Sequence, residues 1–309
     1  MKKSKLKPRR APGVFRSCVA VLSSASIVVS SVASSFAQGI IIDPSAPGTS
    51  FLSSGNGTPQ VDIATPQSGV SLNQFQSFGV DANGLILNNS NSNGVSVIGG
   101  NVMANPNLMI SGPANVIVNE VTGSSSSNLQ GVTEVFGNSA AVVIANPNGL
   151  TCNGCGFLNA TSATLTTGRP TIAGPNVELL VTEGTVTIDG AGVNFGQQGG
   201  VIGRHVVVDG PIVSNGQPSQ NSILVSGGAQ RVNALDFAQI INSDIVSAPS
   251  TVGKTSPFAV DATRNGTING DKVTVLGMEV DQGINLYGTV NTKEMIARAL
   301  GDLFYADVM

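Results

Sequence analysis

Aromatic side chains, charges and histidine are all scarce in this sequence of 309 residues. Tryptophan is absent, aromatic residues make up 4%, charged residues 11%, and His205 is the one histidine. The core must therefore be built mainly from aliphatic side chains. A zinc site that combines several imidazoles is excluded, and the cations after residue 37 form no run of the kind that binds nucleic acid.

What the sequence does contain is glycine, 38 residues of it, and many short stretches of β-branched residues. Val and Ile fill a pleated surface well, and glycine tolerates the positive φ of tight turns, so the pattern predicts many short strands. Representative stretches are Val95–Val97, Val116–Val118, Val142–Ile144, Val186–Ile188, Val206–Val208, Ile223–Val225 and Val273–Val275.

Strands recur at intervals of roughly 7 to 15 residues between Val177 and Val225, and almost no helical periodicity separates them. This spacing fits an antiparallel sandwich or barrel, and it also fits a β-solenoid. We favour the solenoid, because the strands are short and the turns between them vary in length. Near the C-terminus, Ile296, Leu300 and Leu303 follow an i, i+4, i+7 pattern that predicts a short capping helix.

The N-terminus has the layout of a secretory signal peptide. Seven basic residues lie before position 17, and an uncharged apolar stretch then runs from Cys18 to Phe36. Small residues at Ser35 and Ala37 predict cleavage after Ala37, with an uncleaved membrane anchor as the alternative. Removal of residues 1–37 would leave 8 basic and all 18 acidic residues, a net charge of −10, which disfavours nucleic acid and anionic lipid as partners.

Several short segments imitate functional motifs. Residues 248–255 resemble a phosphate-binding loop, but a strand-like sequence follows where that loop requires a helix, so no nucleotide site is expected. Asp81–Gly84 resembles the start of a calcium loop without its later ligands, which favours a plain turn. No nucleophile elbow accompanies His205, so we expect a structural histidine.

Two Asn-Pro-Asn segments predict turns, because proline fixes φ and asparagine bonds the local backbone. The first is Asn105-Pro106-Asn107-Leu108, and the second is Asn146-Pro147-Asn148-Gly149-Leu150. The run from Ile144 to Asn159 closely resembles a hallmark of the filamentous-haemagglutinin secretion domain of two-partner secretion, and Asn105–Leu108 resembles the other hallmark. Further similarity lies in residues 73–75, 78–89, 163–168 and 258–262.

This resemblance implies an all-β protein, a right-handed parallel β-helix with an N-terminal cap and small extra-helical β-hairpins. The expected organisation is a signal peptide at 1–37, an irregular leader or cap at 38–60, the β-helix at 61–292 and a tail at 293–309. The implied partner is an outer-membrane barrel transporter, with secretion through the periplasm to the cell surface or medium. A host-cell surface ligand is a second expected partner, and no cofactor, nucleotide or metal is expected.

In the resembling family, the first Asn-Pro-Asn-Leu segment is tied to recognition by the transporter, and the second mostly to turn geometry. We therefore assign recognition to Asn105, Pro106, Asn107 and Leu108, and a structural turn to Asn146, Pro147, Asn148, Gly149 and Leu150. Cys152 and Cys155 are predicted to form a local disulfide, with free thiols as the alternative.

A catalytic function is not expected from this sequence. The rival interpretation is a β-helical polysaccharide-active enzyme, which needs clustered carboxylates on one face, whereas the charged residues here are scattered. A third interpretation, the passenger fragment of an autotransporter, requires a C-terminal membrane barrel, and residues 293–309 carry no such pattern.

Overall fold

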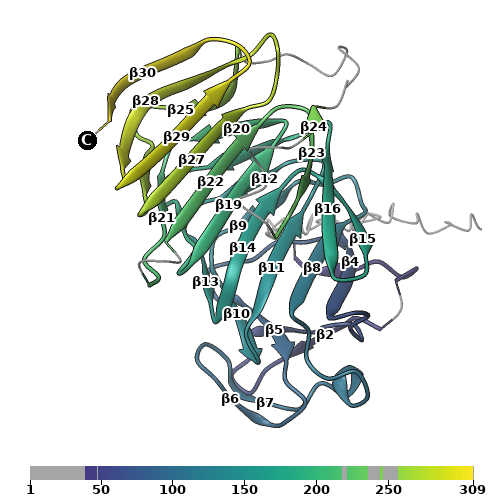
Figure 1. Cartoon of the computed structure of the whole chain (residues 1–309). Helices are drawn as coiled ribbons and strands as arrows, with labels where there is room; N and C mark the ends of the chain where they lie inside the picture. The colour runs from purple at the N-terminus through teal and green to yellow at the C-terminus, as the bar shows by residue number, and fades with distance from the viewer. Residues whose placement is uncertain (1–38, 47, 218–220, 236–243, 246–256, 309) are drawn as a thin grey trace, which may run out of the picture. The chain divides into compact units, whose positions relative to one another are not determined.

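The computed structural model describes residues 39–46, 48–217, 221–235, 244–245 and 257–308. In these ranges the chain is almost entirely β-structure, arranged mainly in two parallel sheets (Figure 1). The predicted signal peptide, its cleavage site after Ala37, and the segment that imitates a phosphate-binding loop lie outside the described residues. Among the described residues, no helix is long and apolar enough to cross a bilayer.

The first sheet stacks one strand from each successive coil of the chain. In spatial order it contains β1 (Ile41–Ile42), β4 (Val70–Ser77), β8 (Val116–Val121), β11 (Ala140–Ala145), β14 (Ala160–Thr166), β19 (Gln198–Gly203), β22 (Ser222–Gly227), β27 (Lys272–Gly277) and β29 (Glu294–Ala299). Apart from the antiparallel β1, neighbouring strands pair in parallel.

The second sheet forms the other two sides of the coils, which meet at the long strand β28. One side runs through β2 (Ser50–Ser53), β3 (Pro59–Asp62), β5 (Leu85–Asn89), β10 (Val132–Gly137), β13 (Cys155–Leu158), β18 (Val193–Asn194), β21 (Pro211–Val213) and β26 (Thr267–Asn269) to β28 (Gly283–Asn291). The other side runs back through β25 (Phe258–Ala262), β20 (His205–Val208), β17 (Thr185–Ile188) and β12 (Leu150–Cys152) to β9 (Ser127–Leu129), and β30 (Leu303–Val308) pairs with β28.

The register of the first sheet shows the length of one coil. Ala141 stacks on Val116 and under Ser162, which are steps of 25 and 21 residues, and Lys272 stacks on Glu294, a step of 22. Longer steps contain excursions from the solenoid. Val70 pairs with Val116 across 46 residues that include the hairpin β6 (Gly94–Ser96) and β7 (Gly100–Val102) and the 3-10 turn η1 (Pro106–Leu108). A parallel β-helix with extra-helical hairpins results.

A second excursion covers the outside of the first sheet. It consists of β15 (Arg169–Ala173), β16 (Asn176–Val181), β23 (Gln230–Asn233) and β24 (Asp244–Ile245), all paired antiparallel. Because successive strand side chains point to opposite faces, β11 places Ala140, Val142 and Ile144 in the interior cluster of the solenoid. Its alternate residues pack in a second cluster with Val177 and Leu179 of β16.

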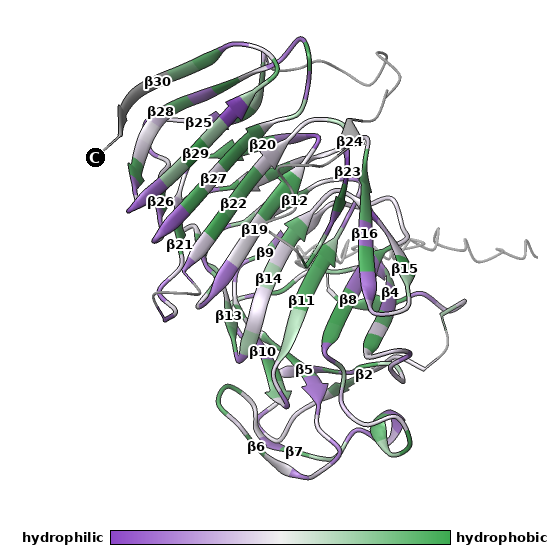
Figure 2. Cartoon of the chain, viewed as in Figure 1, coloured by the Kyte–Doolittle hydropathy of each residue, from purple (hydrophilic) through white to green (hydrophobic). Residues whose placement is uncertain are grey.

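This double coverage explains why every residue of β11 is buried, and Figure 2 shows both β11 and β16 as apolar. Five of the predicted strand stretches lie wholly within solenoid strands of the first sheet or of the β17 and β20 side, from Val116–Val118 to Ile223–Val225, as does Val273–Val275. Val95–Val97 differs, since Gly94–Ser96 belongs to the extra-helical hairpin and the side chains of Val95 and Val97 are exposed.

The predicted C-terminal helix is wrong. Residues 294–299 form β29, which pairs residue by residue with β27, and residues 303–308 form β30. Leu300 and Leu303, which suggested a helical face, are 45% and 40% exposed, whereas Met295 packs against the solenoid interior. The free edge of β27 satisfies the backbone groups of this segment, and pairing with it overrides a weak helical periodicity.

Candidate functional site

The first Asn-Pro-Asn segment forms a short 3-10 turn whose leading asparagine is fully buried. Asn105 Nδ2 donates to the carbonyl oxygens of Ile63 at 3.0 Å and Asn88 at 2.9 Å, and Asn105 Oδ1 accepts from the backbone N–H of Asn107 at 2.9 Å. Leu108 is also fully buried and belongs to the interior cluster. The turn is thus fixed to two neighbouring coils from within.

Asn107 ties the same turn to the N-terminal cap. Its Nδ2 donates to the carbonyl oxygens of Gly48 at 2.6 Å and Ile63 at 2.9 Å, and its own carbonyl accepts from the hydroxyl of Thr65 at 3.0 Å. Gly48 and Thr65 also line a groove of about 520 Å³ between the cap and β4. Of the four residues assigned to recognition, Pro106 alone is exposed, and Asn107 is half-buried.

The second Asn-Pro-Asn segment repeats this hydrogen-bonding scheme one coil later. Buried Asn146 donates to Ser125 O and Ser127 Oγ, both at 2.9 Å, and accepts from the backbone N–H of Asn148 at 3.0 Å. Asn148 Nδ2 reaches back to Gly123 O at 2.8 Å. Gly149, at a φ of 112°, then leads directly into Leu150 of β12. Each segment is therefore an asparagine staple between consecutive turns of the chain.

The chain leaves the two segments in different ways. The second enters a buried strand, whereas the first continues into Met109 and Ile110, whose side chains are 80% and 100% exposed. Sequence reasoning did not single out these two residues. The available signal was a pair of large apolar residues, next to the motif, in a stretch without any charged residue between Asp81 and Glu120.

Cys152 and Cys155 are joined by a disulfide with their Cα atoms 5.5 Å apart. Both sulfurs belong to buried residues of the interior cluster, at the corner between β12 and β13. The bond therefore pins a corner of the solenoid, and a buried position of this kind is typical of a structural disulfide.

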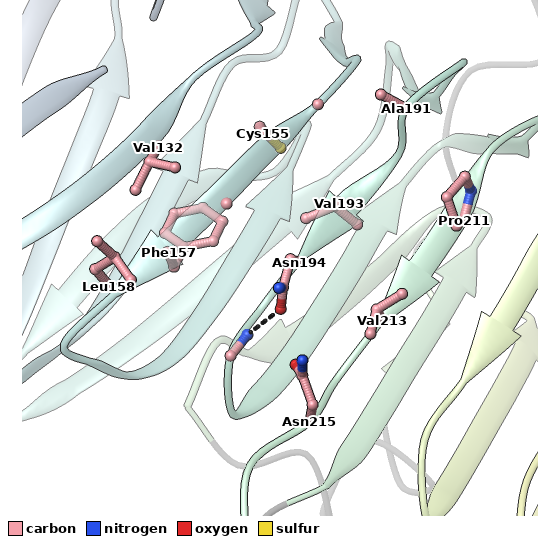
Figure 3. Close-up of a pocket in the computed structure, with 13 residues that line it drawn as sticks. Val132, Cys155, Phe157, Leu158, Ala191, Val193, Asn194, Pro211, Val213 and Asn215 are labelled. Atoms are coloured by element: carbon pink, nitrogen blue, oxygen red, sulfur yellow. Dashed lines mark hydrogen bonds between the residues drawn. The ribbon is translucent and has the colours of Figure 1, made fainter. Parts of the chain in front are cut away.

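A shallow hollow of about 500 Å³ lies on the outer side of β13, β18 and β21 (Figure 3). Its lining includes Phe157, Leu158, Val213 and Asn194, and Asn194 Oδ1 accepts from the backbone N–H of Gly196 at 2.9 Å. No residue of this lining carries an acidic, basic or imidazole side chain. The hollow offers apolar contact and amide hydrogen bonds, but no group for acid–base chemistry.

The remaining imitations of functional motifs have structural partners. His205 is buried in β20, its Nδ1 lies 3.4 Å from the carbonyl oxygen of Phe258, and burial lowers the pKa of its imidazole below the ordinary value despite that contact. Asp81 Oδ1 accepts from the backbone N–H of Asn83 at 2.9 Å, which closes a turn. Over the described residues, no group of three or more His, Cys, Asp or Glu side chains is placed to hold a metal ion.

The fold and the stapled turns define a class of protein, the parallel β-helical secretion domain. The family profile described as "TPS secretion domain" matches residues 38–303, and the chain belongs to that family. Its fold matches a structure described as the filamentous hemagglutinin secretion domain, with a TM-score of 0.74, 32% identity, and coverage of 88% of this chain and 96% of that one. The expected right-handed parallel β-helix is confirmed.

Two curated relatives show how the family uses this domain. The chain is 40% identical over 243 residues to the 16S rRNA endonuclease CdiA of Enterobacter cloacae, which covers 77% of this chain and 7% of that protein. It is 38% identical over 252 residues to the filamentous hemagglutinin of Bordetella pertussis, which covers 80% of this chain and again 7% of the relative. The chain thus spans about 7% of the length of these proteins.

Proposed function

We propose that this chain is the N-terminal secretion domain of a two-partner-secretion exoprotein, recognised in the periplasm by a cognate outer-membrane barrel transporter and exported to the cell surface or medium. The observation that carries the proposal is the family match over residues 38–303, which coincides with the whole described solenoid. The predicted signal peptide at 1–37 would deliver the chain to the periplasm.

The architecture suits export by threading. Each coil buries its apolar residues against the preceding coil, so strands can stack in the order in which they emerge, and each step releases hydrophobic free energy. The disulfide closes a loop with a sequence separation of three residues, so it leaves the chain nearly as thin as a linear one. A long-range disulfide would instead hold two distant segments together.

We infer a non-catalytic role for this domain. The supporting observation is the hollow over β13, β18 and β21, whose lining lacks the pair of carboxylates that glycoside hydrolysis requires. The nuclease named for the CdiA relative belongs to a protein of which this chain matches 7%. Adhesion to a host-cell surface ligand stays a prediction for the whole exoprotein.

We assign recognition by the transporter to the turn at Asn105–Leu108 and a structural role to Asn146–Leu150. The test is expression of the full chain in a Gram-negative host with and without a candidate transporter, followed by immunoblots of medium and periplasm. We expect secretion only with the transporter, and a strong loss for Asn107→Ala. Asn148→Ala is the matched control, because it loses an equivalent bond to the preceding coil.

Retention of the wild-type chain in the periplasm, despite a transporter that exports its own substrate, would overturn the proposed function. An equal loss of secretion for Asn107→Ala and Asn148→Ala would instead show that both turns act only through folding. The recognition assignment would then be wrong.

A further inference from the structure

The residues assigned to recognition are poorly placed to touch a partner themselves. Asn105 and Leu108 are fully buried, and the side-chain nitrogen of Asn107 is directed to the carbonyl oxygens of Gly48 and Ile63. A side chain that spends its donors inside the domain has little left for a second protein. The contact with the transporter therefore has to fall on neighbouring groups that the turn holds in position.

The exposed neighbours form an unusual surface, which we call the apolar end patch. The five most exposed large apolar side chains of the described residues all fall in one short segment, and they are Val95 at 74%, Val97 at 81%, Met103 at 69%, Met109 at 80% and Ile110 at 100%. Hairpin β6–β7 and the 3-10 turn project from the same end of the solenoid (Figure 1). Clustered exposed apolar side chains mark interaction sites in proteins.

The patch is held rigidly in spite of its exposure. Buried Glu134 accepts hydrogen bonds from Ser96 Oγ at 2.6 Å and from the backbone N–H groups of Val97 and Ile98 at 3.0 and 3.1 Å. Beneath the hairpin, Ile86, Val102 and Phe136 form a separate apolar cluster. These contacts fix the hairpin on one side, and the Asn105 staple fixes the turn on the other.

Hydrogen bonds also link the base of the hairpin to the turn. The backbone N–H of Asn105 donates to Ser90 O at 2.8 Å, and that of Ala104 donates to Asn93 Oδ1 at 2.8 Å. A surface that is ordered before binding loses less conformational entropy when a partner docks. A buried carboxylate and a buried asparagine that serve only to hold exposed valines and methionines are difficult to explain without such a partner.

We propose that Met109 and Ile110 are the direct contact with the transporter, and that the asparagines of the Asn105–Leu108 turn position them. This inference rests on the proposed function. Because no charged residue lies between Asp81 and Glu120, the complementary surface on the transporter should be an uncharged apolar hollow. Binding through such a contact should be nearly independent of salt, unlike binding between charged patches.

The test compares the double variant Met109→Ser/Ile110→Ser with Val280→Ser. Val280 is 67% exposed, lies in the turn between β27 and β28, and is a matched control for the loss of surface apolarity. The double variant should fold normally, because both side chains lie in solvent and the Met109 backbone N–H still donates to Pro106 O. Urea unfolding of the full chain, purified from the periplasm of cells without transporter, checks this directly.

We expect the double variant to be secreted at least fivefold less than the wild type, and its affinity for purified transporter in detergent to fall at least tenfold, as for truncation of a central interface anchor. Val280→Ser should behave as the wild type. Wild-type affinity should change less than twofold between 50 and 500 mM NaCl.

A smaller loss in the double variant, or an equal loss in Val280→Ser, would overturn the contact assignment while wild-type secretion still supports the proposed function. A tenfold loss of wild-type affinity in high salt would overturn the apolar character of the contact. Failure of the wild type to be secreted with a competent transporter would instead refute the proposed function itself.

Discussion

Replacement of Asn105 by alanine should destabilise the folded domain strongly for a single polar side chain. The substitution removes three side-chain hydrogen bonds, to Ile63 O, Asn88 O and the backbone N–H of Asn107, at a site without solvent access. A buried hydrogen bond contributes about 1 kcal/mol net, so the free energy of unfolding should fall by about 3 kcal/mol.

Urea unfolding followed by far-ultraviolet circular dichroism measures this loss. With a urea dependence of about 3 kcal/mol per molar, the unfolding midpoint should drop by about 1 M. The matched control is Asn101→Ala, because Asn101 is exposed in β7 and its side chain makes no hydrogen bond in the structure. Its midpoint should change little, since surface substitutions stay within about 0.5 kcal/mol.

A midpoint shift for Asn105→Ala that is no larger than the shift for Asn101→Ala would refute the reasoning. It would mean that the buried amide does not hold the turn to the neighbouring coils. The role of Asn105 in presenting Met109 and Ile110 would then have no structural basis.

Three further changes test other parts of the domain, each by urea unfolding. Joint replacement of Cys152 and Cys155 by alanine should cost about 2 kcal/mol from loop-closure entropy alone, and an unchanged midpoint would contradict a stabilising disulfide. Gly192→Ala should cost more than about 3 kcal/mol, because a Cβ there meets Pro211 O at a φ of 72°, whereas Gly174→Ala, at a φ of 61° with open space, should cost about 1 kcal/mol; equal losses would refute the clash. Because the pKa of His205 is lowered on folding, the unfolded chain binds more protons near and below the ordinary value of 6.5, so stability should decline as pH falls through that region; His205→Gln should flatten this decline, and an identical pH profile would exclude His205 as its source.

Much of the fold was accessible from the sequence because it depends on local chemistry. Glycine at turns with positive φ, β-branched residues at strand positions and asparagine at corners are properties of single residues and their neighbours. Stretches such as Val142–Ile144 and Val206–Val208 are strands in the solenoid for that reason. The long motif from Ile144 to Asn159 then distinguished the solenoid from a sandwich, which spacing alone did not.

The errors arose where a distant segment decides the outcome. Residues 294–299 carry a weak helical pattern, and they form a strand because β27 offers an unpaired edge 22 residues earlier in the chain. Val95–Val97 has the composition of a solenoid strand, but Glu134 and Phe136 of β10 hold this segment outside the coils. Neither partner is visible in the local sequence.

The sequence by itself determined that this protein is an exported, all-β member of its secretion family, because signal-peptide layout, strand composition and motif are written in consecutive residues. The tertiary structure alone decided which motif residues are accessible. Stacking of the coils buries Asn105 and Leu108 and leaves Met109 and Ile110 in solvent, although all four are neighbours in the chain. Burial depends on which segments the coils bring together, and this property is not encoded by any residue in isolation.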